Sequence, residues 1–341
     1  MLNFLRKIKN KIQVKTPPLL EGVKNVIDLN LPYFNFVSFG ELNKDKYFYL
    51  IKRSPGTGLF SNVTFVLNHL AICKKFDFIP VIDMENFNTI YNEKNKVKDT
   101  MNSWNYYFEP LNQYTLDEVY KSKNVLISSD KFYNFFEYNM DRNKELTEIL
   151  QNNIKVKKDI NQLFLRLSKK FNNKKVLGIH FRGTSYKRAQ GHPLPATKKQ
   201  MLQITKKFLS KNMVDIIFLV TEEKDYLNFF QENFPNKLFY LKSAFRSNKN
   251  DAFKVYPRKF HRYKLGRENM IETLLLSKCD YFIYLMSNVS AAAISFNLNK
   301  VQKRYEIKND YNSKNFFIAQ YLWYLKKLLP PKFGGFKNIE I

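Results

Sequence analysis

The sequence predicts a two-lobed α/β protein, on the basis of three observations. The chain has 341 residues, which exceeds one ordinary hydrophobic core and suits two domains of about 150 residues each. Strand-like apolar segments alternate with helix-length segments in two successive series, and such alternation produces largely parallel sheets covered by helices. Polar or glycine-rich clusters follow several strands, at the sheet edge where ligands bind in α/β proteins.

The first series follows the Pro17-Pro18 break and contains a strand, a glycine turn, a helix and a second strand. We expect these elements at 46–53 (KYFYLIKR), 54–58 (SPGTG), 59–76 and 78–83 (FIPVID). A further strand is expected at 123–129 (KNVLISS), and a basic, polar helix at about 144–170 leads into the second series.

The second series opens with a strand and loop at 175–183 (KVLGIHFRG). The next apolar runs predict strands at 214–223, 237–241 and 280–285. The segments between and after them predict helices at 196–211, 225–234, 268–279 and 287–297.

The formal net charge of +27 raises the question of a nucleic-acid partner. Lysines are spread along the whole chain, and the sequence has neither zinc-finger spacing nor an RNP-like aromatic motif. We therefore expect a solvated basic surface, with an anionic membrane surface or anionic substrates as the next candidate partners and nucleic acid disfavoured. Cys73 and Cys279 lie in apolar segments, which predicts reduced, structural thiols in a cytoplasmic protein.

Two basic amphipathic segments make peripheral membrane association a candidate property. The sequence has no signal peptide and no run of 18 apolar residues, so we expect a cytoplasmic protein. The first residues place apolar side chains at helical spacing among four cations, and 321–333 (YLWYLKKLLPPKF) has a similar character. Ordinary docked helices explain both segments equally well, and the alternative is binding to the inner face of the cytoplasmic membrane.

The strongest candidate site is HFRGTSYKRAQGHP (180–193), directly after a buried strand. The guanidinium of Arg182 is a rigid fork of donors that fits phosphate oxygens. Gly183 lets the backbone approach a ligand, and Thr184 and Ser185 add hydroxyl donors. The alternative for Arg182 is a surface salt bridge.

Two other strand ends carry polar clusters. The first contains Ser287, Asn288, Val289 and Ser290. It opens an alanine-rich helix, whose unpaired first-turn N–H groups can bind an anion; a well-capped helix without a ligand is the alternative. The second cluster places Thr221 and Glu222 after another strand.

In this order, the motifs resemble the fucosyltransferase superfamily, which includes the α-1,6-, nodulation and protein O-fucosyltransferases. The likeness rests on HFRGTSY with the later HP pair, on TEE, on ETLLLSKCDYFIYLMSNVS and on GTGLFSNVTFVLNHLAICKKFDFIPVID. It covers roughly 46–85 and 174–300. The resemblance implies a GT-B-like fold, in which two Rossmann-like lobes enclose a cleft and the C-terminal lobe holds most of a GDP-sugar.

The resemblance also implies roles for single residues. His180 would lie against guanosine, Arg182 would bind the β-phosphate and stabilise the departing GDP, and 287–290 would contact the diphosphate. Family members contact guanine through an aspartate eight positions before the aspartate of a CDYFI-like strand, and Glu272 holds that place before Asp280. A carboxylate is the acceptor that the guanine N1–H and N2–H₂ groups require.

Two departures from the family pattern leave the catalytic base open. Ser185 replaces an aspartate that often follows the arginine motif, and Gln190 stands where the α-1,6 branch has its glutamate base. The remaining candidates are His192 and the N-lobe acids Asp83 and Glu85. Alternatively, His192 is a structural turn residue and cations that stabilise the leaving group provide most of the acceleration. No cluster of metal ligands is visible, so we predict metal-independent transfer with inversion.

Two segments have both a functional and a structural interpretation. The aromatic side chains of 102–115 (NSWNYYFEPLNQYT) could stack on an acceptor sugar or form a buried cluster. The basic segment 243–267 could be a mobile flap over the ligands or a disordered loop.

The leading hypothesis is a glycosyltransferase that moves fucose from GDP-fucose to a bacterial surface glycan such as capsule or lipooligosaccharide. This nucleotide sugar is a co-substrate, and no further cofactor is expected. The alternatives are another donor, such as GDP-heptose or GDP-mannose, and a non-enzymatic protein that binds polyanions or glycans. We expect a basic amphipathic segment (1–20), an N-terminal acceptor lobe (21–170), a C-terminal nucleotide-sugar lobe (171–305) and a C-terminal helix with a basic tail (306–341).

Overall fold

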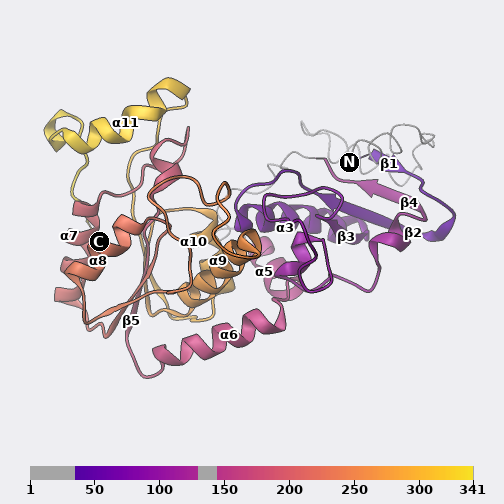
Figure 1. Cartoon of the computed structure of the whole chain (residues 1–341), viewed down its shortest axis with the longest axis horizontal. Coiled ribbons are helices and arrows are strands. Elements are labelled where there is room, and N and C mark those ends of the chain that lie inside the picture. The colour runs from indigo at the N-terminus through magenta and orange to yellow at the C-terminus, as the bar shows by residue number, and fades with distance from the viewer. Residues whose placement is uncertain (1–34, 130–143, 341) are drawn as a thin grey trace. The chain divides into compact units, whose positions relative to one another are not determined.

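A computed structural model describes residues 35–129 and 144–340 of the chain. The expected N-terminal amphipathic segment (1–20) therefore lies outside the described residues. The chain divides into two compact units, which are described separately (Figure 1). Unit 1 extends to Lys158 and also takes Arg258–Gly266, whereas unit 2 contains Asp159–Pro257 and Arg267–Ile341.

Unit 1 is built on a four-stranded sheet with the order β1-β4-β2-β3. Its main elements are β1 (Asn35–Val37), β2 (Leu42–Lys52), α3 (Leu59–Phe76), β3 (Ile79–Asp83), α4 (Leu116–Val119), β4 (Ser122–Ile127) and α5 (Lys144–Asn153). Strand β2 is parallel to β3 and β4, and β1 is antiparallel to β4. The predicted strand, glycine turn, helix and strand of 46–83 are all present.

The central elements of unit 1 are buried on all sides. Residues Phe48 to Ile51 of β2 are fully buried, as expected for a parallel strand with covered faces. Helix α3 is buried from Leu59 to Cys73, which is typical of a helix inside a core. It ends at Asp77, which adopts the left-handed conformation as its C-cap.

Unit 2 is a five-stranded parallel sheet with the order β7-β6-β5-β8-β9. Its strands are β5 (Val176–His180), β6 (Ile216–Val220), β7 (Leu238–Phe239), β8 (Tyr281–Tyr284) and β9 (Lys303–Glu306). Its helices are α6 (Lys158–Ser168), α7 (Lys198–Lys211), α8 (Lys224–Asn233), α9 (His261–Lys278), α10 (Asn288–Phe296) and α11 (Phe316–Leu328). In sequence order the sheet reads 3-2-1-4-5, which is a Rossmann arrangement with its switch point between β5 and β8.

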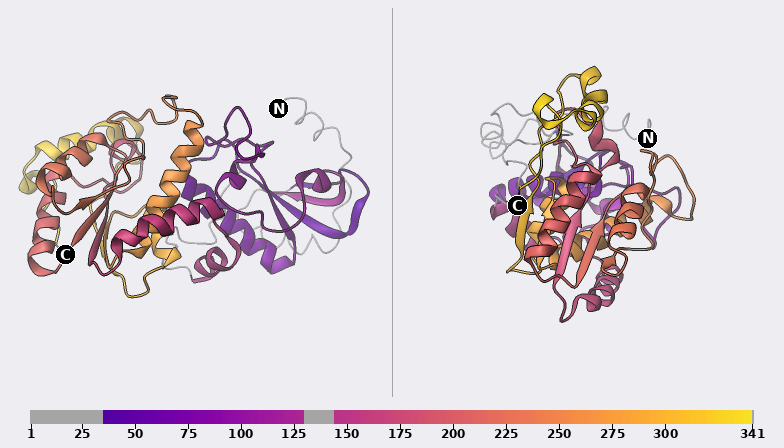
Figure 2. Two further views of the ribbon diagram at one scale, coloured as in Figure 1. Left: turned by 60° about the horizontal axis from the view of Figure 1, so that its bottom comes forward. Right: turned by 90° about the vertical axis from the view of Figure 1, so that its left-hand side faces the viewer.

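Alternate residues of β5 face opposite layers of unit 2. Leu177 and Ile179 belong to the core with Met201, Ile204 and Phe208 of α7. Gly178 faces the other side, where a Cβ atom would lie 3.0 Å from the Sγ atom of Cys279 and 3.1 Å from a methyl group of Leu276. Figures 1 and 2 show α7 and α8 on one side of the sheet and α9 and α10 on the other.

The structure divides the predicted helix at 144–170 into α5 and α6. The residues between them pair with the chain of unit 1 instead: Glu109 N–H donates to Lys155 C=O at 2.8 Å, and Lys157 N–H donates to Tyr107 C=O at 2.9 Å. These bonds hold 154–157 extended, so the helical pattern is interrupted by tertiary pairing.

Helix α9 begins at His261, within the segment that the sequence suggested as a flap. Its first turns belong to unit 1 because tyrosines hold them there. The rings of Tyr107 and Tyr263 stack with centroids 5.9 Å apart, and Tyr263 N–H donates to Glu93 Oε1 at 2.9 Å. A Cβ atom on Gly266 would lie 2.3 Å from the Tyr107 ring, so glycine permits this approach.

The aromatic segment 102–115 forms a buried cluster. Trp104, Tyr106, Tyr107 and Phe108 are at most 3 % exposed. This outcome agrees with the structural interpretation of the segment for these four residues.

We predict that Gly178→Ala lowers the free energy of unfolding by about 1–3 kcal/mol, because the added methyl group overpacks the space between β5 and α9. Urea unfolding followed by circular dichroism measures the change. Gly58→Ala is the matched control: a Cβ atom there has no neighbour within 4 Å, so its effect should stay within about 0.5 kcal/mol. A Gly178→Ala protein as stable as the wild type would show that α9 can withdraw from the strand.

Candidate functional site

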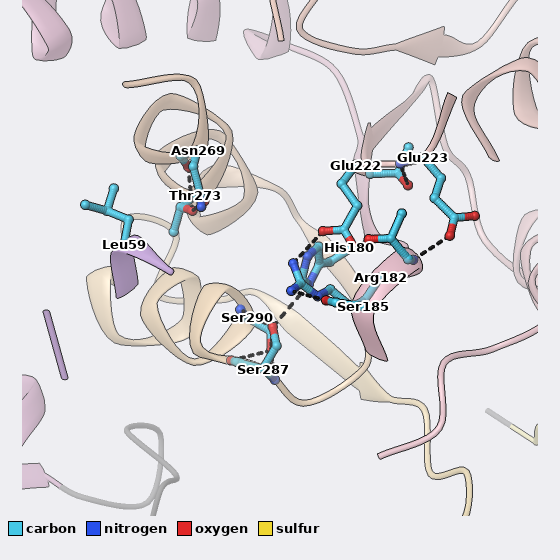
Figure 3. Close-up of polar contacts among 12 residues, drawn as sticks. Leu59, His180, Arg182, Ser185, Glu222, Glu223, Asn269, Thr273, Ser287 and Ser290 are labelled. Carbon is cyan, nitrogen blue, oxygen red and sulfur yellow. Dashed lines mark hydrogen bonds and ion pairs between the residues drawn. The ribbon is translucent and has the colours of Figure 1, made fainter. Parts of the chain in front are cut away.

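The candidate site forms at the switch point of unit 2, where β5 and β8 end side by side. His180 is the last residue of β5 and is 4 % exposed. Its Nδ1 atom lies 3.4 Å from the hydroxyl oxygen of Ser287, which begins α10 directly after β8 (Figure 3). The structure thus brings together two predicted residues that are far apart in the sequence.

Burial keeps the His180 ring neutral. Desolvation, reinforced by the nearby positive charge of Arg182, lowers the pKa of His180 from 6.5 to about 3. A neutral imidazole offers one donor and one acceptor nitrogen, so it can hydrogen-bond a base or a ribose hydroxyl without adding charge.

The first turn of α10 is organised for an anion. Ser287 and Ser290 form a reciprocal capping box, in which Ser290 N–H donates to the Ser287 hydroxyl oxygen at 3.2 Å and Ser287 N–H donates to the Ser290 hydroxyl oxygen at 2.8 Å. The N–H groups of Asn288 and Val289, at the first two helical positions, have no helical carbonyl to bind. Together with the helix dipole, such free N–H groups favour a negative charge near His180.

Arg182 lies next to this turn and is held by two side chains. Its NH1 group donates to Glu222 Oε2 at 2.5 Å, and its NH2 group donates to the Ser185 hydroxyl oxygen at 3.3 Å. The guanidinium also lies 4.6 Å above the Tyr186 ring. Its Nε atom is buried and has no hydrogen-bond partner among the described residues.

Two adjacent glutamates after β6 fix the loop that carries Arg182. Glu222 accepts a hydrogen bond from the Thr184 hydroxyl at 2.5 Å. Glu223 accepts a hydrogen bond from Thr184 N–H and forms an ion pair with Lys187 at 2.6 Å. A Cβ atom on Gly183 would lie 2.6 Å from the Glu223 carboxylate, so only glycine allows this packing.

Glu223 was not among the predicted site residues, although its position beside Glu222 at a strand end could have identified it. Thr221, the other predicted member of this cluster, is buried, and its hydroxyl oxygen accepts a hydrogen bond from Glu223 N–H at 3.3 Å. Its role in the structure is to support the pair of acids.

Glu272 lies on α9 in a buried ion pair with Arg246. The distance is 3.0 Å, and the two side chains are 10 % and 5 % exposed. Desolvation raises the pKa of Glu272 to about 7, against the effect of Arg246. Arg246 also donates to the carbonyl groups of Leu241 and Ala244. Sequence analysis missed Arg246 as a site residue because it lies in an irregular, basic segment where every cation has a similar context.

The candidate bases lie in different places. His192 is in the loop that follows Arg182, beside the Tyr186 ring, and its pKa is lowered by burial and by Arg182. Gln190, which replaces the family glutamate, donates to the carbonyl group of Lys314 at 2.9 Å. His192 therefore stays a candidate that is unprotonated near neutral pH.

Asp83 ends β3 in unit 1 and is fully buried. Its carboxylate accepts hydrogen bonds from Glu85 N–H, from Asn86 and from the Tyr120 hydroxyl, the last at 2.6 Å. These contacts give Asp83 a structural role in the turn after β3, so its role as a base stays a prediction without geometric support. Among the described residues, no group of three or more His, Cys, Asp or Glu side chains could hold a metal ion.

Comparison with solved structures identifies the fold. A crystal structure of NodZ α-1,6-fucosyltransferase co-crystallised with GDP matches with a TM-score of 0.50 and 14 % identity, over 78 % of this chain and 96 % of that one. A selenomethionine form of fucosyltransferase NodZ from Bradyrhizobium matches with the same TM-score and identity, over 78 % and 95 %. POFUT1 in complex with GDP matches with a TM-score of 0.45 and 10 % identity, over 77 % and 99 %. No protein-family model and no curated protein sequence matches the chain.

At this identity the NodZ likeness establishes a shared fold. The predicted α/β, GT-B-like fold class is therefore confirmed, and so is the resemblance in fold to the fucosyltransferases.

We predict that His180 makes the protein sensitive to acid. The unfolded histidine has a pKa near 6.5 and the folded one near 3, so between these values the unfolded state binds the extra proton and stability falls as pH decreases. From pH 7.5 to pH 5 this costs about 2 kcal/mol. Urea unfolding should show that His180→Asn removes that part of the loss.

His192→Asn is the matched control for this measurement, because His192 is exposed and should contribute a smaller share. Glu272, whose raised pKa has the opposite effect on stability, is present in all of these proteins and cancels in the comparison. If His180→Asn loses as much unfolding free energy between pH 7.5 and pH 5 as the wild type, the His180 ring is not buried in its neutral form.

Proposed function

We propose that the protein is an inverting glycosyltransferase that transfers fucose from GDP-fucose to a bacterial surface glycan such as capsule or lipooligosaccharide. One observation carries this proposal: His180, Arg182 and the first turn of α10 meet at the switch point of a Rossmann-type sheet, where α/β proteins bind nucleotides. The fold shared with NodZ, whose structure was determined with GDP, supports the same conclusion.

The chemistry that this geometry supports is displacement at the anomeric carbon. An acceptor hydroxyl attacks from one face, the bond from the sugar to the diphosphate oxygen breaks on the other, and GDP departs with the electron pair. Arg182 and the N–H groups of Asn288 and Val289 stabilise the negative charge that develops on the diphosphate. The reaction needs no metal ion in this proposal, because these groups provide the positive charge.

Donor binding requires Arg182 to change partners. Its NH1 group is bound to Glu222, so a phosphate oxygen must compete with that carboxylate. His192 is our candidate to accept the proton of the acceptor hydroxyl, since its pKa is lowered and its loop begins at Arg182.

A pocket of about 280 Å³ in unit 1 is a candidate acceptor site. It lies along β3, an edge strand, and its lining includes Glu85, Asn102, Trp104, Asn112 and Tyr114. Trp104 is buried, so the aromatic ring available to the apolar face of a sugar is that of half-buried Tyr114, and the amide and carboxylate groups suit the sugar hydroxyls. This pocket supports a glycan as the second substrate.

Other donors remain as alternatives within the same proposal, because Ser185, Gln190 and Glu272 depart from the family pattern. GDP-heptose and GDP-mannose retain the guanine and diphosphate groups that the site suits. A non-enzymatic glycan-binding or polyanion-binding protein is the alternative from another class. We also propose that the protein acts at the inner face of the cytoplasmic membrane, where such acceptors are made. Within the described part of the chain, no helix is long and apolar enough to cross a bilayer.

We predict that GDP raises the melting temperature of the protein and that Arg182→Ala abolishes this shift, because the guanidinium is the main cation at the diphosphate. Differential scanning fluorimetry with and without GDP measures the effect. Arg188→Ala is the matched control: it lies in the same loop but is exposed, so the GDP shift should be retained. Stabilisation by RNA and none by GDP would contradict the transferase proposal.

A panel of nucleotide sugars tests the donor. We expect binding and slow hydrolysis of GDP-fucose, measured by calorimetry and by release of GDP, and no binding of UDP- or CMP-sugars. Glu272→Gln should weaken GDP binding by about tenfold, since an amide accepts fewer hydrogen bonds from guanine and loses the charge. Binding of UDP-sugars in preference to GDP-sugars would exclude the guanine role of Glu272 and His180.

A further inference from the structure

Helix α11 is apolar on the side that faces away from unit 2. Its inner side is anchored by Ala319 and Trp323, and Trp323 Nε1–H donates to the carbonyl group of Pro195 at 2.7 Å. The outer side carries the α11 face, which we define as Phe317, Tyr321, Leu325 and Leu328. These four side chains are 76 %, 66 %, 55 % and 81 % exposed. Their spacing places them along one side of the helix.

The exposed apolar residues of the protein are concentrated around this helix. Of the sixteen large apolar residues that are exposed in the described parts of the chain, ten lie between Tyr311 and Phe333. A contiguous apolar patch of this kind is typical of a surface that another body covers. Figure 1 and the right-hand view of Figure 2 show α11 at the periphery of unit 2, where it is accessible.

The chain segment that contains α11 is mostly positive. From Tyr311 to Ile339 the chain contains five lysines and no aspartate or glutamate. The lysines are Lys314, Lys326, Lys327, Lys332 and Lys337. Lys326 pairs with Asp310 at 2.8 Å, and the other four lysines are exposed. The occupant of this face therefore has to be both apolar and negatively charged.

We propose that the α11 face docks the protein onto the surface of a bilayer that contains anionic phospholipids. The helix lies in the plane of the interface, with Phe317, Leu325 and Leu328 among the acyl chains and the lysines at the headgroups. Tyr321 presents a ring to the apolar side and a hydroxyl group to the wet side, as aromatic residues do at membrane interfaces. A helix of 13 residues spans about 20 Å, less than the hydrocarbon core, so it lies on the membrane and does not cross it.

The charges argue against a second copy of the chain as the occupant. A two-fold contact through the α11 face would place lysines of one copy against lysines of the other. No carboxylate lies between Tyr311 and Ile339 to compensate them. Anionic headgroups supply that negative charge.

Vesicle co-sedimentation of the full-length protein tests the proposal independently of the transfer reaction. We expect binding to vesicles of equal parts phosphatidylcholine and phosphatidylglycerol, and weak binding to phosphatidylcholine alone. Phe317→Ser combined with Leu328→Ser should reduce the partition coefficient on the mixed vesicles by about tenfold or more. Lys327→Glu combined with Lys332→Glu should remove the preference for the anionic vesicles.

The matched control is Met213→Ser combined with Val301→Ser. These two apolar residues of unit 2 are 83 % and 80 % exposed but lie outside α11, so their replacement should leave vesicle binding unchanged. Thermal unfolding should be the same for all variants, because every substituted side chain is exposed. The proposal is overturned if the wild type does not bind the mixed vesicles or if the Phe317/Leu328 variant binds as well as the wild type. It is also overturned if the wild type forms a dimer by light scattering and does not bind lipid, and if the Phe317/Leu328 substitutions abolish that dimer.

Discussion

Strand β5 is hydrogen-bonded to β6 on one side and to β8 on the other, and the candidate site depends on this position. Because three parallel strands end at the same edge, the loops that follow them meet, although their residues are far apart in the sequence. Arg182 follows β5, Glu222 follows β6 and Ser287 follows β8. The close approach of α9 to Gly178 fixes the position of this helix against the sheet beneath these loops.

The cations of this site are paired with acids even though the chain is strongly basic. The pairs are Arg182–Glu222, Lys187–Glu223 and Arg246–Glu272. Arg182 and Glu222 are 25 % and 31 % exposed, so this pair can exchange partners at a lower cost than a fully buried pair. In the proposed function, a diphosphate replaces Glu222 by binding both Arg182 and the first turn of α10, whereas a small anion has fewer contacts with which to compete. Internal pairing thus favours an extended anion over a simple salt ion.

The sequence was sufficient to predict the elements and positions that local patterns determine. Apolar runs located β5, β6 and β8, and the Ser287 cap located the start of α10. Contacts between distant segments could not be predicted in this way. The pairing of Arg246 with Glu272 joins an irregular segment to a helix, and the start of α9 at His261 depends on tyrosines in unit 1 and not on an apolar pattern of its own. For the same reason Asp83 looked like a free acid: its hydrogen bonds come from the turn that it closes and from Tyr120.

The segment Arg258–Gly266 belongs to unit 1, although it is encoded after most of unit 2. Its Tyr263 stacks on and hydrogen-bonds to Tyr107 and also hydrogen-bonds to Glu93, both of unit 1. During synthesis on the ribosome, unit 1 therefore cannot complete its packing until this segment has emerged. By then the strands β5 and β6 have already left the exit tunnel. The N-terminal half of the protein cannot reach its final packing first, so translation order and folding order differ in this chain.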